Sequence, residues 1–207
     1  MPDGLPLPEP VFAADLHIHT CLSPCGSLEM SPRAVVDAAA AAGLSLIAVT
    51  DHNCAANCAP VIKLAAEQGI AVLPGMEVTT VEEAHVLTLF KELDEALDFA
   101  DFIYARLPDI PNDPLRFGDQ VIVDEKENIT GEVGKYLGMA TDLSVDALLQ
   151  EASSRGALVI PSHIDRPYAG IIAQLGFLPP LPFIAVEVAW RRNLALAGEY
   201  TAVASSD

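Results

Sequence analysis

The sequence predicts a single α/β domain in which short buried strands alternate with helices. Hydrophobic residues make up 51% of the 207 residues, which is enough to build one substantial core. Apolar runs of strand length recur along the chain, and most are separated by segments with helix start and stop signals. The expected strands are seven, at residues 13–19, 44–50, 70–77, 84–90, 157–163, 183–188 and 201–206.

Capping residues mark the helix boundaries. Ser31 can cap a helix that has Pro32 at its first position, continues through an alanine-rich stretch to Ala42 and ends at Gly43. Three more helices are expected, at residues 59–68 before Gly69, at 91–107, and at 144–155 before Gly156.

The strand at residues 84–90 is expected to reverse direction. Only residues 78–84 separate Glu77 from His85, and a parallel crossover needs roughly a dozen residues or more. An antiparallel strand would place His85, at its start, beside Glu77 at the end of the preceding strand.

Two segments depart from the alternation. Residues 120–124 and 129–133 flank the polar residues 125–128, a pattern typical of a β-hairpin. We therefore interpret residues 108–140 as an insertion that carries a β-hairpin. The proline-rich residues 1–11 are expected to form a flexible leader to the domain, which otherwise spans residues 1–207.

The composition argues against several classes of partner. Eleven basic and 29 acidic residues give a net charge of -18, so extended nucleic acid is not an expected partner. No apolar run reaches the roughly 18 residues of a membrane span, and the first basic residue is Arg33, unlike a secretory signal. We therefore expect a cytoplasmic protein without a membrane partner. The sequence gives no signal of its oligomeric state.

The chain has five histidines, and each lies at or just beyond the end of a predicted strand: His17, His19, His52, His85 and His163. Strand ends in alternating α/β folds converge on one face, where active sites form. Core packing would explain one such histidine more readily than five. His17 and His19 lie two residues apart on one strand, so both can bind one metal ion from the same face.

The order of these motifs resembles the PHP domain (polymerase and histidinol phosphatase) superfamily, from Asp15 to Asp207. The motifs are HxH at residues 17–19, TDH at 50–52, GME at 75–77, the strand-leading His85 and PSH at 161–163. The resemblance implies a distorted seven-stranded, TIM-like β/α barrel, with up to three divalent metal ions at the carboxyl ends of its strands. It also implies hydrolysis of phosphate monoesters or diesters. The nitrogen-rich, carboxylate-containing set of residues suits zinc, manganese or iron.

The resemblance also implies a role for individual residues. His17 and His19 would hold a first metal, Glu77 would bridge to a second metal bound by His85 and His163, and His52 would bind a third. Asp207 matches the aspartate of the family's terminal DxH motif and would bind the first metal. The histidine of that motif is not in this sequence, so either the chain is a truncated product or the third site lacks one ligand.

Cys25 stands where the family usually offers Asp or His to the third metal. A thiolate there would suit zinc or iron and disfavour magnesium. The alternative is a small buried cysteine without a ligand role. Cys21 and Cys25, with Cys54 and Cys58, also allow a separate four-thiolate site, although the CxxxC spacing is unlike short CxxC motifs.

Two further residues are expected to support catalysis, Arg166 and Asp51. Arg166 follows His163 and can hold a substrate phosphate through two hydrogen bonds; the alternative is a surface ion pair with Asp165. Asp51, like Asp15, is expected to orient an imidazole rather than to bind metal.

The sequence therefore predicts a metal-dependent phosphoesterase acting on a small phosphorylated substrate. Clustered divalent ions allow a metal-bridged hydroxide near neutral pH, so no protein nucleophile is needed. One alternative is a nuclease acting on nucleic acid ends, which the scarcity of Lys and Arg disfavours. The other is a non-catalytic metal-binding regulatory module, which the missing terminal histidine favours.

Overall fold

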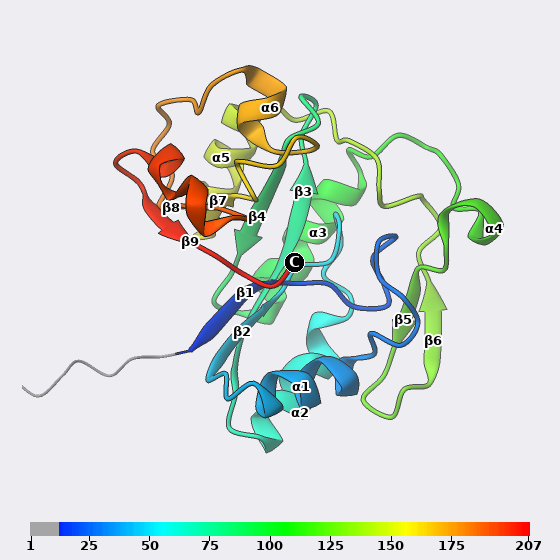
Figure 1. Ribbon diagram of the computed structural model, residues 1–207. Helices are drawn as coiled ribbons and strands as arrows, with labels where there is room; N and C mark the ends of the chain where they lie inside the picture. The colour runs from blue at the N-terminus through cyan, green and yellow to red at the C-terminus, as the bar shows by residue number, and fades with distance from the viewer. Residues whose placement is uncertain (1–12) are drawn as a thin grey trace, which may run out of the picture.

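A curled five-stranded sheet forms the centre of the molecule in the computed structural model, which describes residues 13–207 (Figure 1). Its order is β1 (Ala14–Ile18), β2 (Leu46–Val49), β3 (Ala71–Thr79), β4 (His85–Leu89) and β7 (Leu158–Pro161). β1, β2 and β3 are parallel, and β4 runs antiparallel to both β3 and β7. The predicted reversal is thus confirmed, whereas the predicted leader, residues 1–11, lies outside the described residues.

This strand arrangement brings distant parts of the sequence to one edge of the sheet. Because β4 is antiparallel to both of its neighbours, β7 points in the same direction as β1, β2 and β3. The carboxyl ends of four strands and the first residue of β4 therefore meet at the same edge.

The four predicted helices are all present, as α1 (Pro32–Ala41), α2 (Cys58–Glu67), α3 (Leu93–Tyr104) and α5 (Val145–Ser154). The Ser31 hydroxyl accepts a hydrogen bond from the backbone N of Ala34 at 3.2 Å, as a helix cap does. Gly43, Gly69 and Gly156 follow α1, α2 and α5 with φ of 70°, 70° and 83°, a conformation that favours glycine. Each helix contributes side chains to one large core cluster, among them Val36, Val61, Phe99 and Leu148.

Three short helices were not predicted: α4 (Pro114–Phe117), α6 (Ile171–Leu175) and the 3-10 helix η1 (Arg191–Ala197). Segments of four to seven residues are too short to show a helical period in the sequence. Among residues 13–207, no helix has the length and apolarity that crossing a membrane requires.

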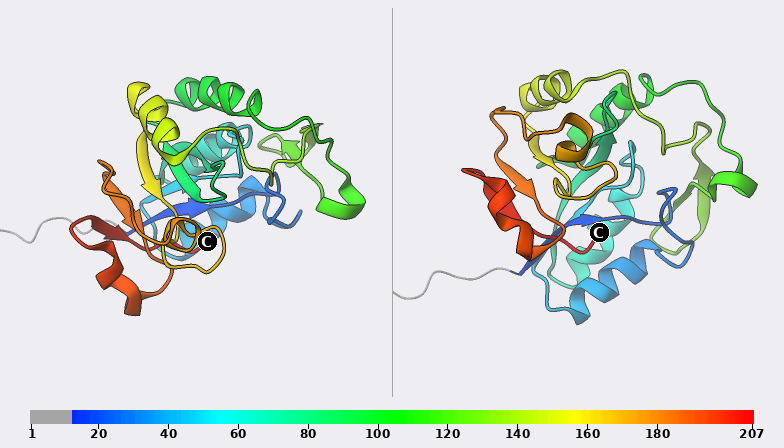
Figure 2. Two further views of the ribbon diagram at one scale, coloured as in Figure 1. Left: turned by 90° about the horizontal axis from the view of Figure 1, so that it is seen from above. Right: turned by 45° about the horizontal axis from the view of Figure 1, so that its top comes forward.

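The seven predicted strands exist, but they do not close into one hydrogen-bonded barrel within the described residues. β8 (Ala185–Glu187) and β9 (Thr201–Val203) pair only with each other, in parallel (Figure 2). Both strands have three residues, and β7 ends at Pro161, which has no N–H for a neighbouring strand. The sheet is therefore a curled half-barrel, with the β8–β9 pair beside it.

The predicted insertion contains an antiparallel strand pair, β5 (Val121–Val123) and β6 (Ile129–Glu132). This pair lies to one side of the main sheet in both views of Figure 2. The buried side chain of Asn57 holds it in place, because its amide donates to the backbone O of Val121 and accepts from the backbone N of Val123.

Candidate metal centre

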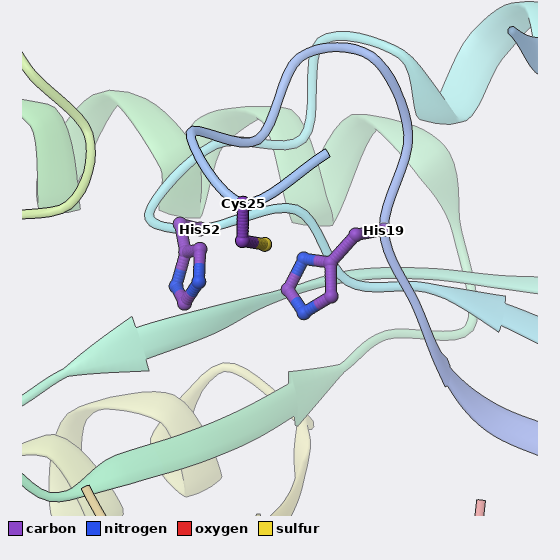
Figure 3. Close-up of side chains that lie close together, drawn as sticks. All are labelled: His19, Cys25 and His52. Carbon is purple, nitrogen blue, oxygen red and sulfur yellow. The ribbon is translucent and has the colours of Figure 1, made fainter. Parts of the chain in front are cut away.

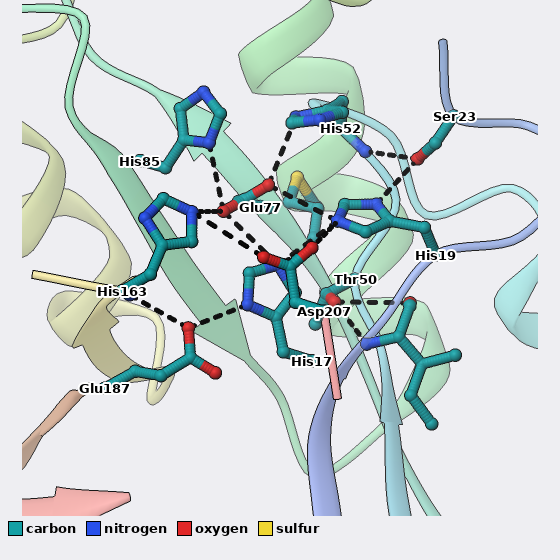
Figure 4. Close-up of polar contacts among 12 residues, drawn as sticks. His17, His19, Ser23, Thr50, His52, Glu77, His85, His163, Glu187 and Asp207 are labelled. Atoms are coloured by element: carbon teal, nitrogen blue, oxygen red, sulfur yellow. Dashed lines mark hydrogen bonds and ion pairs between the residues drawn. The ribbon is translucent and has the colours of Figure 1, made fainter. Parts of the chain in front are cut away.

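Glu77 lies at the centre of a cluster of all five histidines of the chain (Figure 4). Its side chain is 1% exposed. A ring nitrogen of each histidine lies within 3.5 Å of one of its carboxylate oxygens: His17 Nε2 at 3.3 Å, His19 Nε2 at 3.5 Å, His52 Nδ1 at 3.3 Å, His85 Nδ1 at 3.1 Å and His163 Nε2 at 3.1 Å. The fold thus brings the predicted histidines and Glu77 into one group.

Asp207 joins this group from the segment after β9. Its Oδ1 lies 3.3 Å from His19 Nε2 and 3.7 Å from His17 Nε2, and its Oδ2 lies 3.9 Å from His163 Nε2. The Nε2 atoms of His17 and His19 are only 3.2 Å apart. Two imidazoles and a carboxylate are thus directed at the same small volume.

The carboxylates of the cluster favour positive charge on two of the histidines, His17 and His19. Burial opposes protonation of His17, but the nearby carboxylates of Glu77 and Glu187 outweigh it and raise its pKa to about 10. Burial also opposes protonation of His19, yet its hydrogen bonds, that to Asp207 foremost, raise its pKa well above the usual value. His52 behaves differently, because burial and the neighbouring histidines outweigh Glu77 and lower its pKa to about 3.

Glu77 itself remains ionised. Burial would raise its pKa, but the surrounding histidines, His17 first, hold the pKa well below its usual range. A buried carboxylate beside two protonated imidazoles, those of His17 and His19, is an arrangement in which cations can replace the protons.

The residues present fit divalent cations. Three groups of possible ligand atoms each lie within 4.8 Å of one another: His17, His19 and Glu77; His52, Glu77 and His85; and His19, Cys25 and His52. His163 and Asp207 border these groups through the contacts given above. Imidazole nitrogen, carboxylate oxygen and thiolate sulfur are the ligands that zinc and similar ions take in proteins.

Cys25 lies beside His19 and His52 in the third group (Figure 3). Its side chain is exposed, so the alternative of a small buried cysteine is wrong. The separate four-thiolate site does not form: Cys21 Sγ contacts the Asn57 amide at 3.7 Å, and Cys58 Sγ contacts the backbone O of Gly75 at 3.6 Å. Cys54 packs beside the Leu22 cluster, and burial raises its pKa to about 11.

Arg166 lies at the rim of the cluster, in a pocket of about 360 Å³ that includes Glu77 and Asp207. Its Nη1 lies 2.6 Å from Asp207 Oδ2, and its Nη2 donates to the backbone O of Asp207 at 2.9 Å. The alternative of an ion pair with Asp165 is wrong. The Asp165 carboxylate accepts instead from the backbone N of Ala189 and from two further groups near it.

Asp51 and Asp15 do not contact the imidazoles. Asp51 Oδ1 accepts from the backbone N of Thr20 at 2.7 Å and from Ser23 Oγ at 2.8 Å, so its link to the cluster runs through Ser23. Asp15 Oδ1 accepts from the backbone N of His17 at 3.3 Å and of Ser206 at 3.2 Å. The expectation that Asp15 orients an imidazole is wrong, because its carboxylate accepts from backbone N–H groups and not from a histidine ring.

Two polar residues that contact the histidine rings were missed by the sequence reasoning, Glu187 and Ser23. Glu187 Oε2 lies 2.8 Å from His17 Nδ1, and Ser23 Oγ lies 2.8 Å from His19 Nδ1. A signal for Glu187 existed, because it is the only charged residue of the apolar stretch 183–188. Ser23 has no comparable signal in its neighbourhood.

Comparison with known proteins agrees with the motif pattern. Residues 15–107 match the family model of the PHP domain. A 3',5'-nucleoside bisphosphate phosphatase of Chromobacterium violaceum is 40% identical over 73 residues, which are 35% of this chain and only 25% of that protein.

Two solved structures share the fold. The first, a putative metal-dependent phosphoesterase from Bifidobacterium adolescentis, is 18% identical, with a TM-score of 0.64 over 96% of this chain and 88% of its own. The lesion-specific endonuclease EndoQ of Pyrococcus furiosus is 16% identical, with a TM-score of 0.68 over 95% of this chain and 48% of its own. The resemblance seen in the histidine motifs is thereby confirmed by the family model over residues 15–107, and the two structures show the same fold over most of the chain.

Proposed function

We propose that this protein is a metal-dependent phosphoesterase that hydrolyses a small phosphate monoester or diester. The observation that carries the proposal is the convergence of five imidazoles on the buried Glu77 carboxylate, with Arg166 at the rim of the same pocket. The phosphatase and phosphoesterase names of two similar proteins support the reaction class.

The proposed ligands combine residues of the three groups with His163 and Asp207, which border them. His17, His19 and Asp207 would hold one ion, Glu77 would bridge to a second held by His85 and His163, and His52 with Cys25 would hold a third. Zinc, manganese or iron are the proposed metals, since nitrogen and sulfur ligands disfavour magnesium. Such ions lower the pKa of bound water and polarise phosphoryl oxygens.

The chain's own residues would bind and orient the substrate. Arg166 carries a planar guanidinium that can hold a phosphate through two hydrogen bonds, as it now holds Asp207. Asp51, through Ser23, and Glu187 would keep the imidazoles in place. Burial of His17, His19 and Glu77 excludes bulk water from the base of the pocket.

A small substrate is favoured over a polynucleotide. The net charge of -18 repels a long polyanion, while cations in the pocket would attract a single phosphate group locally. Four free cysteines support a reducing, cytoplasmic setting.

Replacing His17 and His19 together with alanine tests the proposal. We expect loss of metal, measured by elemental analysis of protein purified without chelators, and loss of turnover on a panel of phosphate monoesters and diesters. Lys63→Ala is the control, because Lys63 is exposed and pairs with Glu125 outside the cluster. Unchanged turnover in the double variant would rule the proposal out.

The same panel separates the alternatives. Cleavage of oligonucleotide ends, with salt-dependent binding, would indicate a nuclease. Metal-replete protein that hydrolyses no phosphoester would indicate a regulatory module.

A further inference from the structure

The hydroxyl of Ser23 contacts two histidines of the cluster, His19 and His52 (Figure 4). It also contacts Asp51. Ser23 Oγ lies 2.8 Å from His19 Nδ1, 2.8 Å from Asp51 Oδ1 and 3.0 Å from the backbone N of His52. Ser23 and Asp51 are both completely buried. These three protein groups are therefore the hydrogen-bond partners of the hydroxyl.

The direction of each hydrogen bond follows from the number of hydrogens. A serine hydroxyl has one hydrogen and two lone pairs. The backbone N–H of His52 can only donate, so it uses one lone pair. Asp51 Oδ1 also accepts from the backbone N of Thr20, and Asp51 Oδ2 accepts from Thr20 Oγ1, so both carboxylate oxygens act as acceptors and the Ser23 hydrogen lies toward Asp51. One lone pair remains, and it faces His19 Nδ1.

His19 Nδ1 must then carry a hydrogen and donate it to Ser23. The other ring nitrogen, Nε2, faces His17 Nε2 at 3.2 Å, Asp207 Oδ1 at 3.3 Å and Glu77 Oε2 at 3.5 Å. This is the nitrogen that a metal ion would meet.

We propose that Ser23 is a positioning residue that fixes the tautomer of His19, so that Nε2 keeps its lone pair for a metal ion. Asp51 acts through it by holding the direction of the Ser23 hydroxyl. The inference rests on the proposed function, because the tautomer matters for activity only if Nε2 binds an ion.

A second buried serine provides a matched control. Ser162 precedes His163 in the cluster, and it is as completely buried as Ser23. Its Oγ has no hydrogen-bond partner. Ser162→Ala thus removes a buried hydroxyl beside a histidine without removing a contact to an imidazole.

The tautomer can be read directly by NMR of protein labelled with ¹⁵N-histidine, with the His19 signals assigned by comparison with His19→Gln. In the metal-free wild type at alkaline pH and in the zinc-loaded wild type, we expect hydrogen on Nδ1 of His19. In Ser23→Ala we expect a mixture of tautomers and a zinc affinity lower by about 10- to 100-fold. Ser162→Ala should match the wild type in both measurements.

Two results would overturn the inference. One is a wild-type spectrum with the hydrogen on Nε2, which decides the matter even if Ser23→Ala does not fold. The other is a folded Ser23→Ala protein with an unchanged His19 tautomer and zinc affinity. Failure of the proposed function looks different: the wild type would show the expected tautomer and yet hydrolyse no phosphoester.

Discussion

Glu187 and His17 are separated by 170 residues in sequence, yet Glu187 Oε2 lies 2.8 Å from His17 Nδ1. The same oxygen accepts a hydrogen bond from the backbone N of His163 at 2.9 Å. Both side chains are buried. A carboxylate on β8 thus orients an imidazole on β1 and fixes the backbone at the end of β7. This gives β8 a function in the site even though it is outside the main sheet.

Glu187→Ala is expected to weaken zinc binding by about 10- to 100-fold, because His17 Nδ1 loses its acceptor. Glu187→Gln should cost less, since its amide oxygen can still accept from Nδ1. Competition with a chromophoric chelator measures the affinity, and circular dichroism checks the fold. Equal zinc affinities for a folded alanine variant and the wild type would show that the contact does not tune the site.

Metal binding at pH 7 is expected to release about two protons. In the metal-free protein, nearby carboxylates raise the pKa of His17 to about 10 and the pKa of His19 well above its usual value. Both imidazoles are therefore protonated at pH 7. A metal ion binds only neutral imidazoles. The apparent affinity of the protein for the metal should therefore rise as the pH increases toward about 10.

Calorimetry in buffers with different ionisation enthalpies counts these protons. His17→Gln should release fewer protons than the wild type. A binding enthalpy that does not depend on the buffer would contradict the prediction.

Cobalt(II) should report whether Cys25 binds an ion. A thiolate ligand gives an intense sulfur-to-cobalt charge-transfer absorption, which imidazole and carboxylate ligands lack. We expect this absorption in the wild type and in Cys54→Ser, and its loss in Cys25→Ser. Cys54 is a fair control because its thiol packs in an apolar cluster away from the three candidate groups. Persistence of the absorption in Cys25→Ser would exclude Cys25 as the ligand.

Arg166→Ala is expected to raise KM for a phosphorylated substrate by about 10- to 100-fold, the effect of losing hydrogen bonds to a charged group. Arg166→Lys keeps the charge but not the planar fork, so its KM should be intermediate.

Arg192→Ala should leave KM unchanged, because the Arg192 guanidinium lies over the Trp190 ring, 5.1 Å from its centroid. Metal analysis must accompany the kinetics, since Arg166 also holds Asp207. An unchanged KM in metal-replete Arg166→Ala would remove Arg166 from substrate binding.

Local signals in the sequence determined the elements and their directions. Ser31 caps a helix, Gly43 and Gly156 follow helix ends, and the short connection before His85 forces an antiparallel strand. These effects act within a few residues, so they can be read without the rest of the chain. Because the five histidines lie at the predicted strand ends, the sequence also predicted that they would meet at one edge of the sheet.

Only the tertiary structure decided which groups surround those histidines. Glu187 reaches His17 because β8 packs beside β7, and Asp15 misses the imidazoles because its side chain is turned to the backbone of His17 and Ser206. The separation of β8 and β9 from the main sheet likewise depends on how strands meet in space. Hydrogen-bond partners far apart in sequence are selected by packing of the whole chain, and no local pattern of residues encodes that choice.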